Sequence, residues 1–404
     1  MPSTAPRLRK ASGRAPRPDG SMRICHVTPH LPPDQAANAL LPAELAAWAV
    51  RTGHDVTMVS HEPAQGRAAA PIAAGRVWRL PRKKAAGPVG TLLRIETIKQ
   101  ARRIRRALEE AATGADVLHL HSNGLIVEVA AAWAARRMPY ILTLYGTEVW
   151  HFKRRRPIDP FARAFERATA VTYYSRKLME HAIDAGLRHP RGQVVYPAIG
   201  SAFGPRDDAA REGLRAALGI SEPRVILNVK RLHELAGQQY LIEAFARIAR
   251  GRSDVRLVVC GAGPLRDSLQ TLAKDRGVDG RVTFAGLVDN PVVAQYAAVA
   301  DVFALPSLLE ALPTVAVEAL ASGTPVVSAD HPGGVELHEL FGEDVRVVPR
   351  TNVDRLADAL LDAIDRPRRV SAVTLDLTRR HFSVAAVTDA YSALYESSLA
   401  QDLQ

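Results

Sequence analysis

Short apolar runs alternate with helical patterns twice along this chain, and this repetition limits the possible folds more than any other feature. The strand-like runs of the first half are RICHVTP, DVTMVS, VWRLP, DVLHLHS, YILTLYG, AVTYYS and QVVYPAI. Those of the second half are RVILNVKRL, VRLVVCGAG, RVTFAGLV, DVFALPS, TPVVSAD and DVRVVP. Strands that alternate with helices form parallel sheets covered on both faces. We therefore predict an α/β protein of two doubly wound domains that face a central cleft, the default ligand site of such a pair.

The domain boundaries follow from composition and turn residues. The chain has 404 residues, of which 47% are hydrophobic, and this is enough for two cores. Residues 1–21 are rich in Pro, Ala, Arg and Ser and are expected to form a disordered basic tail. The turn-rich GSAFGPRDD joins a first domain over 22–204 to a second over 205–383. We assign 384–404 to an amphipathic C-terminal helix that packs back on one of the domains, the first in our assignment.

Cysteine usage and hydropathy suggest a compartment. Cys25 and Cys260 both lie in strand-like runs, so we expect two reduced core residues and a reducing compartment rather than a disulfide or a metal framework. No apolar run is long enough to span a membrane, and the N-terminus lacks the apolar stretch of a signal peptide. We therefore expect a cytoplasmic protein, with peripheral attachment to the inner face of the membrane as an open alternative.

The positive charge is concentrated in the first half. Residues 1–200 carry 31 Lys and Arg against 15 Asp and Glu, whereas residues 201–404 carry 22 against 27. One segment, RIETIKQARRIRRALEE, combines a basic face with apolar positions, and Lys153–Arg156 forms a second basic patch. Such a helix fits an anionic membrane surface, and a solvated helix face explains it equally well. Nucleic acid is the least favoured partner, because the basic patches lack interleaved aromatic residues and a reader motif.

Polar and glycine residues follow several strands of the second half. Arg231 comes directly after a strand, where its planar charged group suits a phosphate, although a surface arginine is the simpler interpretation. Gly261 and Gly263 form a turn between a strand and a helix, where backbone could approach a ligand. Arg266 stands where a dinucleotide-binding fingerprint needs its third glycine, so we discount an oxidoreductase.

The segment PSLLEALPTVAVEALASGTPVVSAD places two carboxylates around a predicted helix start. Pro313 favours the first turn of a helix, so Glu310 falls in the preceding loop and Glu318 in the helix. The unpaired N–H groups of Thr314 and Val315 would then form an anion site. Each glutamate could hold the hydroxyls at one end of a sugar nucleotide, whereas a capping Glu310 and a solvated Glu318 is the alternative.

Together these motifs resemble the retaining glycosyltransferases of family 4, which have two Rossmann-like domains in the GT-B arrangement. The resemblance covers nearly the whole chain from Met22 onward. Its most specific element is the E-x7-E motif, here Glu310 to Glu318. Supporting it, in order, are KRLHELAGQQYLIEAF, CGAGPLRDSL, FAGLVDN and YAAVADVFALPS.

The resemblance implies a nucleotide-sugar donor bound by the second domain, with no cofactor and no metal. It gives Glu310 and Arg231 the catalytic roles, on the hydroxyls of the transferred sugar and on the diphosphate respectively. Glu318 would hold the ribose, and Gly263 would line the diphosphate pocket. The loop Phe284–Val288, with Leu287, would lie against the base. The acceptor hydroxyl would attack on the face that the nucleotide leaves, with the leaving phosphate as base.

Two departures from the family pattern stand out. The family usually has a lysine five residues after the arginine, on the diphosphate, and this chain has Ala236 there, so that Lys230, His233 or an arginine elsewhere would have to compensate. The usual Gly-Gly pair after the first strand is replaced by Ala36 and Ala37, next to Asn38, which we take as an acceptor-binding candidate. Both departures also fit a non-catalytic nucleotide-sugar-binding partner subunit.

The first half supplies the other acceptor candidates. Tyr145 stands near the place where many relatives have a histidine, and Glu148 could hold an acceptor hydroxyl or amine. His121 lies nearer its strand end than His119, which should share the same face but lie deeper in the sheet. The expected function is transfer of a sugar to a glycan or lipid-linked acceptor in cell-surface polysaccharide or glycolipid synthesis. A small soluble acceptor such as an aminocyclitol is the alternative.

Overall fold

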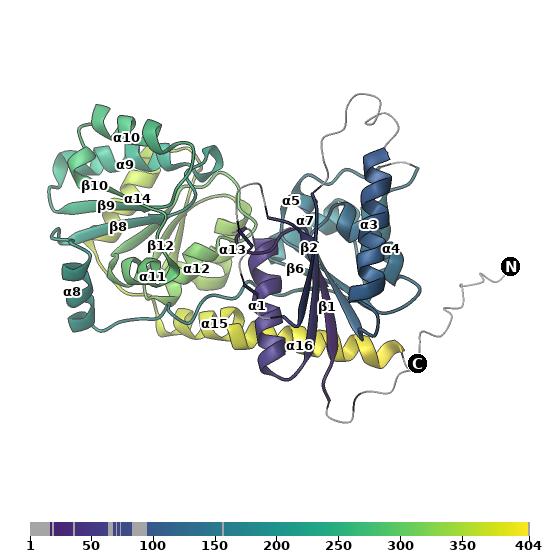
Figure 1. The fold of residues 1–404 in the computed structure, drawn as a ribbon. Helices are drawn as coiled ribbons and strands as arrows, with labels where there is room; N and C mark the ends of the chain where they lie inside the picture. The colour runs from purple at the N-terminus through teal and green to yellow at the C-terminus, as the bar shows by residue number, and fades with distance from the viewer. Residues whose placement is uncertain are drawn as a thin grey trace. The chain divides into compact units, whose positions relative to one another are not determined.

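The computed structural model describes Arg17 and residues 20–34, 37–63, 68–69, 71–72, 74–82, 95–155 and 157–402. Contacts divide the chain into two compact units, each built on one parallel sheet (Figure 1). The first unit takes its residues from Met1–Val195 and Thr388–Gln404, and the second is Tyr196–Val387. The predicted class, two doubly wound α/β domains, is therefore confirmed.

The first sheet has seven strands in the order β3-β2-β1-β4-β5-β6-β7. Every neighbouring pair is parallel. Each of the seven runs expected from the first half of the sequence forms one strand. Their bounds are β1 Arg23–Val27, β2 Asp55–His61, β3 Arg76–Leu80, β4 Val117–His121, β5 Tyr140–Leu144, β6 Ala170–Tyr173 and β7 Gly192–Val194.

The second sheet has six parallel strands in the order β10-β9-β8-β11-β12-β13. The bounds are β8 Arg224–Val229, β9 Val255–Cys260, β10 Val282–Gly286, β11 Val302–Leu305, β12 Val326–Ala329 and β13 Val345–Val348. The chain order reverses between β8 and β11, and such a reversal opens a crevice at the carboxyl ends of the two strands. The strands of both sheets could be predicted from the sequence because each is a separate apolar run between turns.

Helices connect the strands. Those of the first unit are α1 Ala37–Arg51, α3 Ile95–Ala111, α4 Leu125–Ala134, α5 Thr147–Trp150, α6 Pro160–Glu166 and α7 Arg176–Asp184. Those of the second unit are α8 Asp208–Ala217, η1 Glu234–Ala236, α9 Gln238–Gly251, α10 Arg266–Asp275, η2 Asp279–Arg281, α11 Asn290–Val299, α12 Thr314–Ala321, α13 Pro332–Phe341, η3 Gly342–Asp344, α14 Val353–Asp365 and α15 Ala372–Phe382.

The core of the second unit lies on both faces of its sheet, which explains the unbroken apolar runs. In β11, Phe303 and Leu305 pack into one cluster with residues of α11, α12 and α13. Val302 and Ala304 pack into the other cluster, with residues of α9, α10 and α14. Because helices cover both faces of the sheet, the residues on each face of β11 are apolar and the strand shows no alternation of polar and apolar residues. All four residues of the strand are therefore apolar, and the first polar side chain, that of Ser307, lies in the loop beyond.

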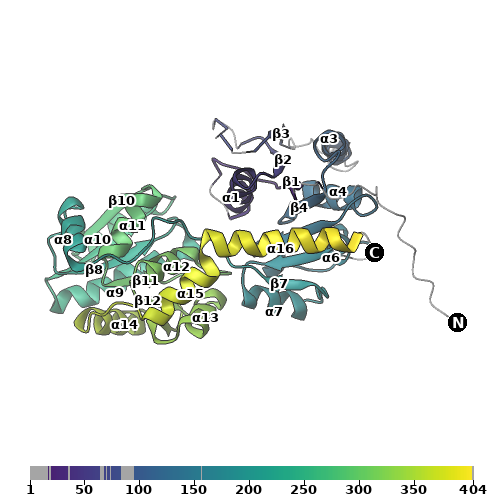
Figure 2. The same cartoon turned by 90° about the horizontal axis from the view of Figure 1, so that it is seen from below.

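The C-terminal helix α16, Val384–Asp402, belongs to the first unit from Thr388 onward (Figure 2). Its Tyr391 and Tyr395 are fully buried there.

Cys25 of β1 and Cys260 of β9 are buried free thiols in different units, and burial raises the pKa of each to about 12. Both cysteines are thus core residues, as expected. None of the helices in the described part of the chain is long and apolar enough to cross a membrane.

Candidate functional site

The predicted donor-binding residues of the second unit gather at one edge of its sheet. Lys230 and Arg231 follow β8, and Gly261 and Gly263 follow β9. The loop that carries Glu310 follows β11, which is hydrogen-bonded to β8. Because the strands are parallel, all three loops come to the same edge, at the point where the chain order reverses.

The two glycines let the loops after β8 and β9 touch. A Cβ atom on Gly261 would lie 2.0 Å from the carbonyl oxygen of Lys230, and one on Gly263 would lie 2.1 Å from that of Leu232. No side chain fits at these distances, and Gly261 also has a φ of +144°, a conformation that other residues rarely adopt. The glycines therefore fix the backbone of Lys230 and Arg231, a role that the sequence pattern did not indicate.

Glu310 pairs with a lysine rather than standing alone. Its Oε1 lies 2.5 Å from Nζ of Lys230, and the side chains are 16% and 26% exposed respectively. Arg231, the next residue, is exposed and has no ion-pair partner among the described residues. The loops after β8 and β11 thus carry the carboxylate of Glu310 and the cations of Lys230 and Arg231, which suits a ligand with both hydroxyl and phosphate groups.

Backbone contacts hold the loop of Glu310 in place. The N–H group of Leu308 donates to the carbonyl oxygen of Leu235 at 2.8 Å, and that of Gly333 donates to the carbonyl oxygen of Glu310 at 3.1 Å. Arg350 donates to the carbonyl oxygen of Leu308 at 3.2 Å while its Nε contacts Asp330 at 2.9 Å. These bonds come from three other segments, so the position of Glu310 is set by tertiary structure.

Helix α12 begins at the predicted residue. Pro313 is its N-cap, and Ala316 and Val317 both donate to the Pro313 carbonyl oxygen. The N–H groups of Thr314 and Val315 come before these bonds, at the positions where a helix leaves its donors unpaired. Glu318 lies in the second turn of this helix and is half-buried. The order of loop carboxylate, helix start and helix carboxylate predicted from the segment is present.

Two further residues that the sequence analysis singled out, Leu287 and Ala236, differ in exposure. Leu287 follows β10 and is 67% exposed, so an apolar side chain there lacks cover in the second unit. Ala236 is 3% exposed and ends the short turn η1, which Gly237 closes with a φ of +69°. A Cβ atom on Gly237 would lie 2.2 Å from the Pro306 carbonyl oxygen, so this turn packs tightly on the end of β11.

The acceptor candidates of the first unit are bound to neighbouring residues. The Tyr145 hydroxyl lies 2.8 Å from Nδ1 of His121. Glu148 is buried, and its carboxylate accepts the N–H group of Tyr145 at the start of α5. Burial raises the pKa of Glu148, while backbone N–H groups and the Ser122 hydroxyl act in the opposite direction. The carboxylate thus stabilises the turn after β5. The side chain of Asn38 lies outside the described residues, as do Ala36 and Arg156.

Two family models match the chain. The one described as "Glycosyl transferase 4-like domain" matches residues 42–198, and the one described as "Glycosyl transferases group 1" matches residues 210–374. The chain belongs to the group 1, family 4-like glycosyltransferases. The resemblance seen in the sequence is therefore confirmed. One match covers most of the residues of the first sheet, and the other covers those of the second sheet.

Individual relatives of this glycosyltransferase differ in what they act on. It is 32% identical over 225 residues to the GDP-mannose-dependent alpha-(1-6)-phosphatidylinositol monomannoside mannosyltransferase of Mycolicibacterium smegmatis, covering 54% of this chain and 57% of that protein. It is 28% identical over 326 residues to alpha-D-kanosaminyltransferase of Streptomyces kanamyceticus, covering 76% of this chain and 81% of that protein. This chain therefore spans little more than half the length of the mannosyltransferase.

Solved structures share the fold of this glycosyltransferase. Sucrose-phosphate synthase from Thermosynechococcus elongatus matches with a TM-score of 0.74 at 20% identity, over 94% of this chain and all of that one. At this identity the likeness shows the fold alone. Together with the two parallel sheets, it establishes the GT-B fold.

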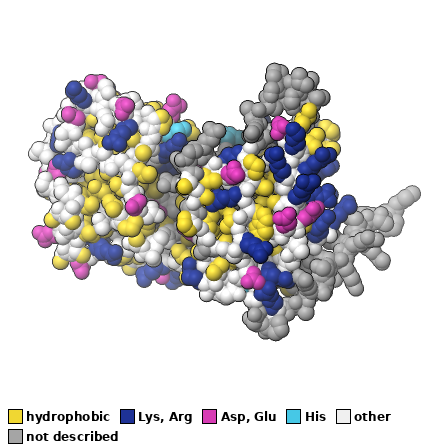
Figure 3. Space-filling model, in the orientation of Figure 1, with side chains coloured by type: hydrophobic (Ala, Val, Ile, Leu, Met, Phe, Trp, Pro, Cys, Tyr) yellow, Lys and Arg dark blue, Asp and Glu magenta, His cyan; other side chains and the backbone are white. Residues whose placement is uncertain are grey.

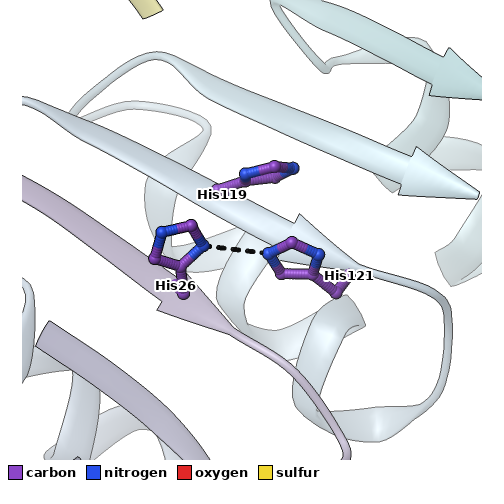
Figure 4. Close-up of side chains that lie close together, drawn as sticks. All are labelled: His26, His119 and His121. Carbon is purple, nitrogen blue, oxygen red and sulfur yellow. Dashed lines mark hydrogen bonds between the residues drawn. The ribbon is translucent and has the colours of Figure 1, made fainter. Parts of the chain in front are cut away.

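A cluster of three histidines lies beside the acceptor candidates of the glycosyltransferase (Figure 4). His26 of β1 pairs in register with His119 of β4, and His121 follows two residues later, so all three side chains share one face of the sheet. Nδ1 of His26 lies 3.0 Å from Nε2 of His121. All three are fully buried, and burial lowers the pKa of His26 to about 3 and those of the other two well below the usual range.

The histidine cluster is built as a hydrogen-bonded network. Nδ1 of His119 lies 2.7 Å from the Tyr395 hydroxyl, and its Nε2 lies 2.7 Å from the Thr143 hydroxyl. The possible ligand nitrogens of the three rings lie within 4.8 Å of one another. Both nitrogens of His119 are hydrogen-bonded to hydroxyl groups, however, so binding a metal through His119 would break one of these bonds. The arrangement therefore fits packing between the sheet and α16 better than metal binding. Its signal in the sequence was the alternation of His119 and His121, whereas His26 could be added only once β1 and β4 were known to be neighbours.

Proposed function

We propose that this protein is a retaining glycosyltransferase that moves a sugar from a nucleoside diphosphate sugar to an acceptor hydroxyl, in cell-surface polysaccharide or glycolipid synthesis. The observation that carries the proposal is the ion pair of Lys230 and Glu310 at the switch point of the second sheet, with Arg231 next in the same loop and the start of α12 just after Glu310 in the chain. Family membership gives the reaction class, and these residues supply the groups that the reaction needs.

The division of labour follows from charge. Arg231 is exposed and its planar group can bind two phosphate oxygens at once. The N–H groups of Thr314 and Val315 add a helix start, which favours the same negative charge. Glu310 accepts hydrogen bonds from hydroxyls of the transferred sugar, and Glu318 does so from the ribose. Leu287 lies against the base, where its exposed side chain gains cover.

The reaction needs no protein nucleophile in this scheme. The bond from the anomeric carbon to the diphosphate oxygen breaks, and the acceptor oxygen bonds to that carbon on the same face. The acceptor proton passes to an oxygen of the leaving diphosphate. Cationic groups stabilise the charge that develops on this leaving group, and such stabilisation is often the largest part of catalysis.

The acceptor is best sought among lipids, because of the exposed face of α3. Figure 3 shows Lys and Arg side chains gathered over this helix. Arg102, Arg103 and Arg106 are exposed there, and Ile95 and Ile98 are 40% and 51% exposed at its start. A basic face beside exposed apolar groups suits an anionic lipid surface. The Mycolicibacterium smegmatis relative is named as a phosphatidylinositol monomannoside mannosyltransferase, and this agrees with a lipid acceptor.

A small soluble acceptor is the second candidate. It is favoured by the kanosaminyltransferase, which this chain matches over 81% of the relative's length. Vesicles of anionic lipid separate the two candidates: a lipid-acting enzyme should sediment with them, and Arg102→Glu with Arg106→Glu should release it. The matched control places the same charge changes on the second unit, at Arg250 and Lys274, which are exposed. Equal binding by both double variants would count against the α3 surface.

The donor is tested with a panel of nucleotide sugars. A donor that binds the folded state should raise the melting temperature, by an amount that grows with the logarithm of its concentration over its Kd, and the purified chain should then transfer its sugar. Arg231→Ala and Glu310→Gln should each lower transfer by at least about tenfold, since each removes more than about 1.4 kcal/mol of transition-state stabilisation. The controls are Arg250→Ala and Glu212→Gln, both on exposed helix faces. Unchanged transfer by both site variants would refute the proposal, and transfer by the pure chain would exclude a non-catalytic subunit.

A further inference from the structure

We propose that Lys230 is a donor-binding residue whose ammonium group contacts the diphosphate while it holds Glu310, in place of the lysine that the chain lacks at position 236. The inference rests on the proposed function, because it assumes a diphosphate at this edge of the sheet. It assigns a specific contact to a residue that the family pattern leaves out.

The backbone of Lys230 is fixed while its side chain reaches into the site. Its N–H group donates to the carbonyl oxygen of Cys260 at 3.0 Å, and its own carbonyl oxygen lies against Gly261. Its ammonium nitrogen lies 2.5 Å from Glu310 Oε1. The side chain is 26% exposed, so the ammonium group is close to the glutamate yet open to a ligand. A fixed base and a reachable charge are what a phosphate-binding lysine needs.

The charge of Lys230 also affects His331, a residue at the end of a third strand, β12. His331 follows β12 and is fully buried, and its Nδ1 accepts the N–H group of Gly334 at the start of α13. Burial, together with the charges of Lys230 and Arg350, lowers the pKa of His331 to about 3, while Asp330 acts in the opposite direction. Lys230 therefore stands among the ends of β8, β11 and β12. A diphosphate bound at the switch point would lie within the reach of such a charge.

Two other residues that could replace the missing lysine, Arg350 and His233, already bind neighbouring groups. Arg350 is paired with Asp330 and with the carbonyl oxygen of Leu308. The His233 ring accepts the N–H group of Leu235 and so caps the turn η1. Ala236 itself is buried, so the position that usually carries the lysine faces the interior of this turn. Lys230 is paired as well, but its partner is Glu310 itself, and its side chain is still 26% exposed.

One ammonium group can serve both partners. It has three N–H donors, so it can bind Glu310 through one and a phosphate oxygen through another. Without the donor, the pair keeps the Glu310 carboxylate in position. With the donor bound, negative charge grows on the diphosphate as the bond to the sugar breaks, and the ammonium group stabilises it. Lys230 would therefore contribute to donor affinity and to the chemical step.

The test compares ligands with and without phosphates. Binding of UDP and GDP, and of uridine and guanosine, is measured by calorimetry for the wild type, Lys230→Met, Lys230→Arg and the exposed control Lys274→Met. We expect Lys230→Met to weaken diphosphate binding by about tenfold or more, the equivalent of one charged contact, and to leave nucleoside binding unchanged. Lys230→Arg should retain most of the affinity because it keeps the charge, and Lys274→Met should match the wild type.

Three other results would count against Lys230, and they differ in what else they affect. If Lys230→Met binds the diphosphate as tightly as the wild type, Lys230 does not touch it and the proposed function stands. If diphosphate and nucleoside affinity fall together, Lys230 is structural and the inference fails. If the wild type binds no nucleoside diphosphate while its melting curve shows a folded protein, the proposed function and the inference fall together.

Discussion

The buried histidines of the first unit make its stability depend on pH. In the unfolded chain an imidazole takes up a proton near pH 6.5, whereas burial lowers the pKa of folded His26 to about 3. The unfolded state therefore binds more protons between these values, and the free energy of unfolding falls as the pH falls through this window. Above pH 6.5 the ring is neutral in both states and the effect is absent.

The size of the effect follows from linkage. At pH 5, a histidine that stays neutral in the folded state costs about 2 kcal/mol relative to pH 7. His119 and His121 have pKa values lowered in the same direction by burial and by their neighbours, so the three together cost up to about 6 kcal/mol. Glu44 and Glu148 offset part of this loss, because desolvation raises the pKa of both carboxyl groups, that of Glu44 to about 7. Many domains have a total stability of only about 5–15 kcal/mol, so acid should unfold this unit readily.

The variant His26→Leu isolates one third of the effect. Urea unfolding at pH 7 and pH 5 is followed by tryptophan fluorescence, because the four tryptophans all precede residue 196 and report the first unit. The loss of stability between the two pH values should be about 2 kcal/mol smaller in His26→Leu than in the wild type. The control is His151→Leu, at an exposed position. An equal loss in His26→Leu and the wild type would refute the assignment of a low pKa to this buried ring.

Two substitutions, one in each unit, test the packing of the protein. Gly263→Ala should destabilise the second unit by about 2–4 kcal/mol, because its Cβ atom would lie 2.1 Å from the Leu232 carbonyl oxygen; urea unfolding followed by circular dichroism measures this. Its control Gly213→Ala, where a Cβ atom meets nothing within 4 Å in helix α8, should instead stabilise by about 0.5–1 kcal/mol, and equal losses would contradict the steric argument. Tyr395→Phe should cost about 1–3 kcal/mol by tryptophan fluorescence, since Nδ1 of His119 loses its partner; no loss would show that the hydroxyl contributes nothing.

Much of the local structure of the candidate donor site could be predicted from the sequence. Pro313 divides an apolar segment into a loop and a helix, and the helix begins at Thr314 as expected. Arg231 stands after its strand because the apolar run ends just before it. These features depend on local rules, which are the preference of proline for helix starts and the sorting of apolar residues into strands. Local rules are visible in any short stretch of the chain.

The roles of other residues could not be read in this way. Gly261 and Gly263 were expected to face a ligand, yet each also admits a neighbouring carbonyl oxygen. Glu148 was expected to hold an acceptor, yet its carboxylate binds the N–H group of Tyr145. Both outcomes depend on what packs against the residue, and the sequence does not contain that information at the position itself. The acceptor role of Glu148 stays a prediction.

The sequence by itself determined the two parallel sheets, the course of the strands and helices around the candidate donor site, and the family. It could do so because apolar periodicity and turn residues act over a few neighbouring positions. The tertiary structure alone decided that Lys230 meets Glu310 and that His26 joins His119 and His121. Those contacts exist because β8 lies beside β11 and β1 beside β4. Strand order brings together residues far apart in the chain, and their chemistry depends on it.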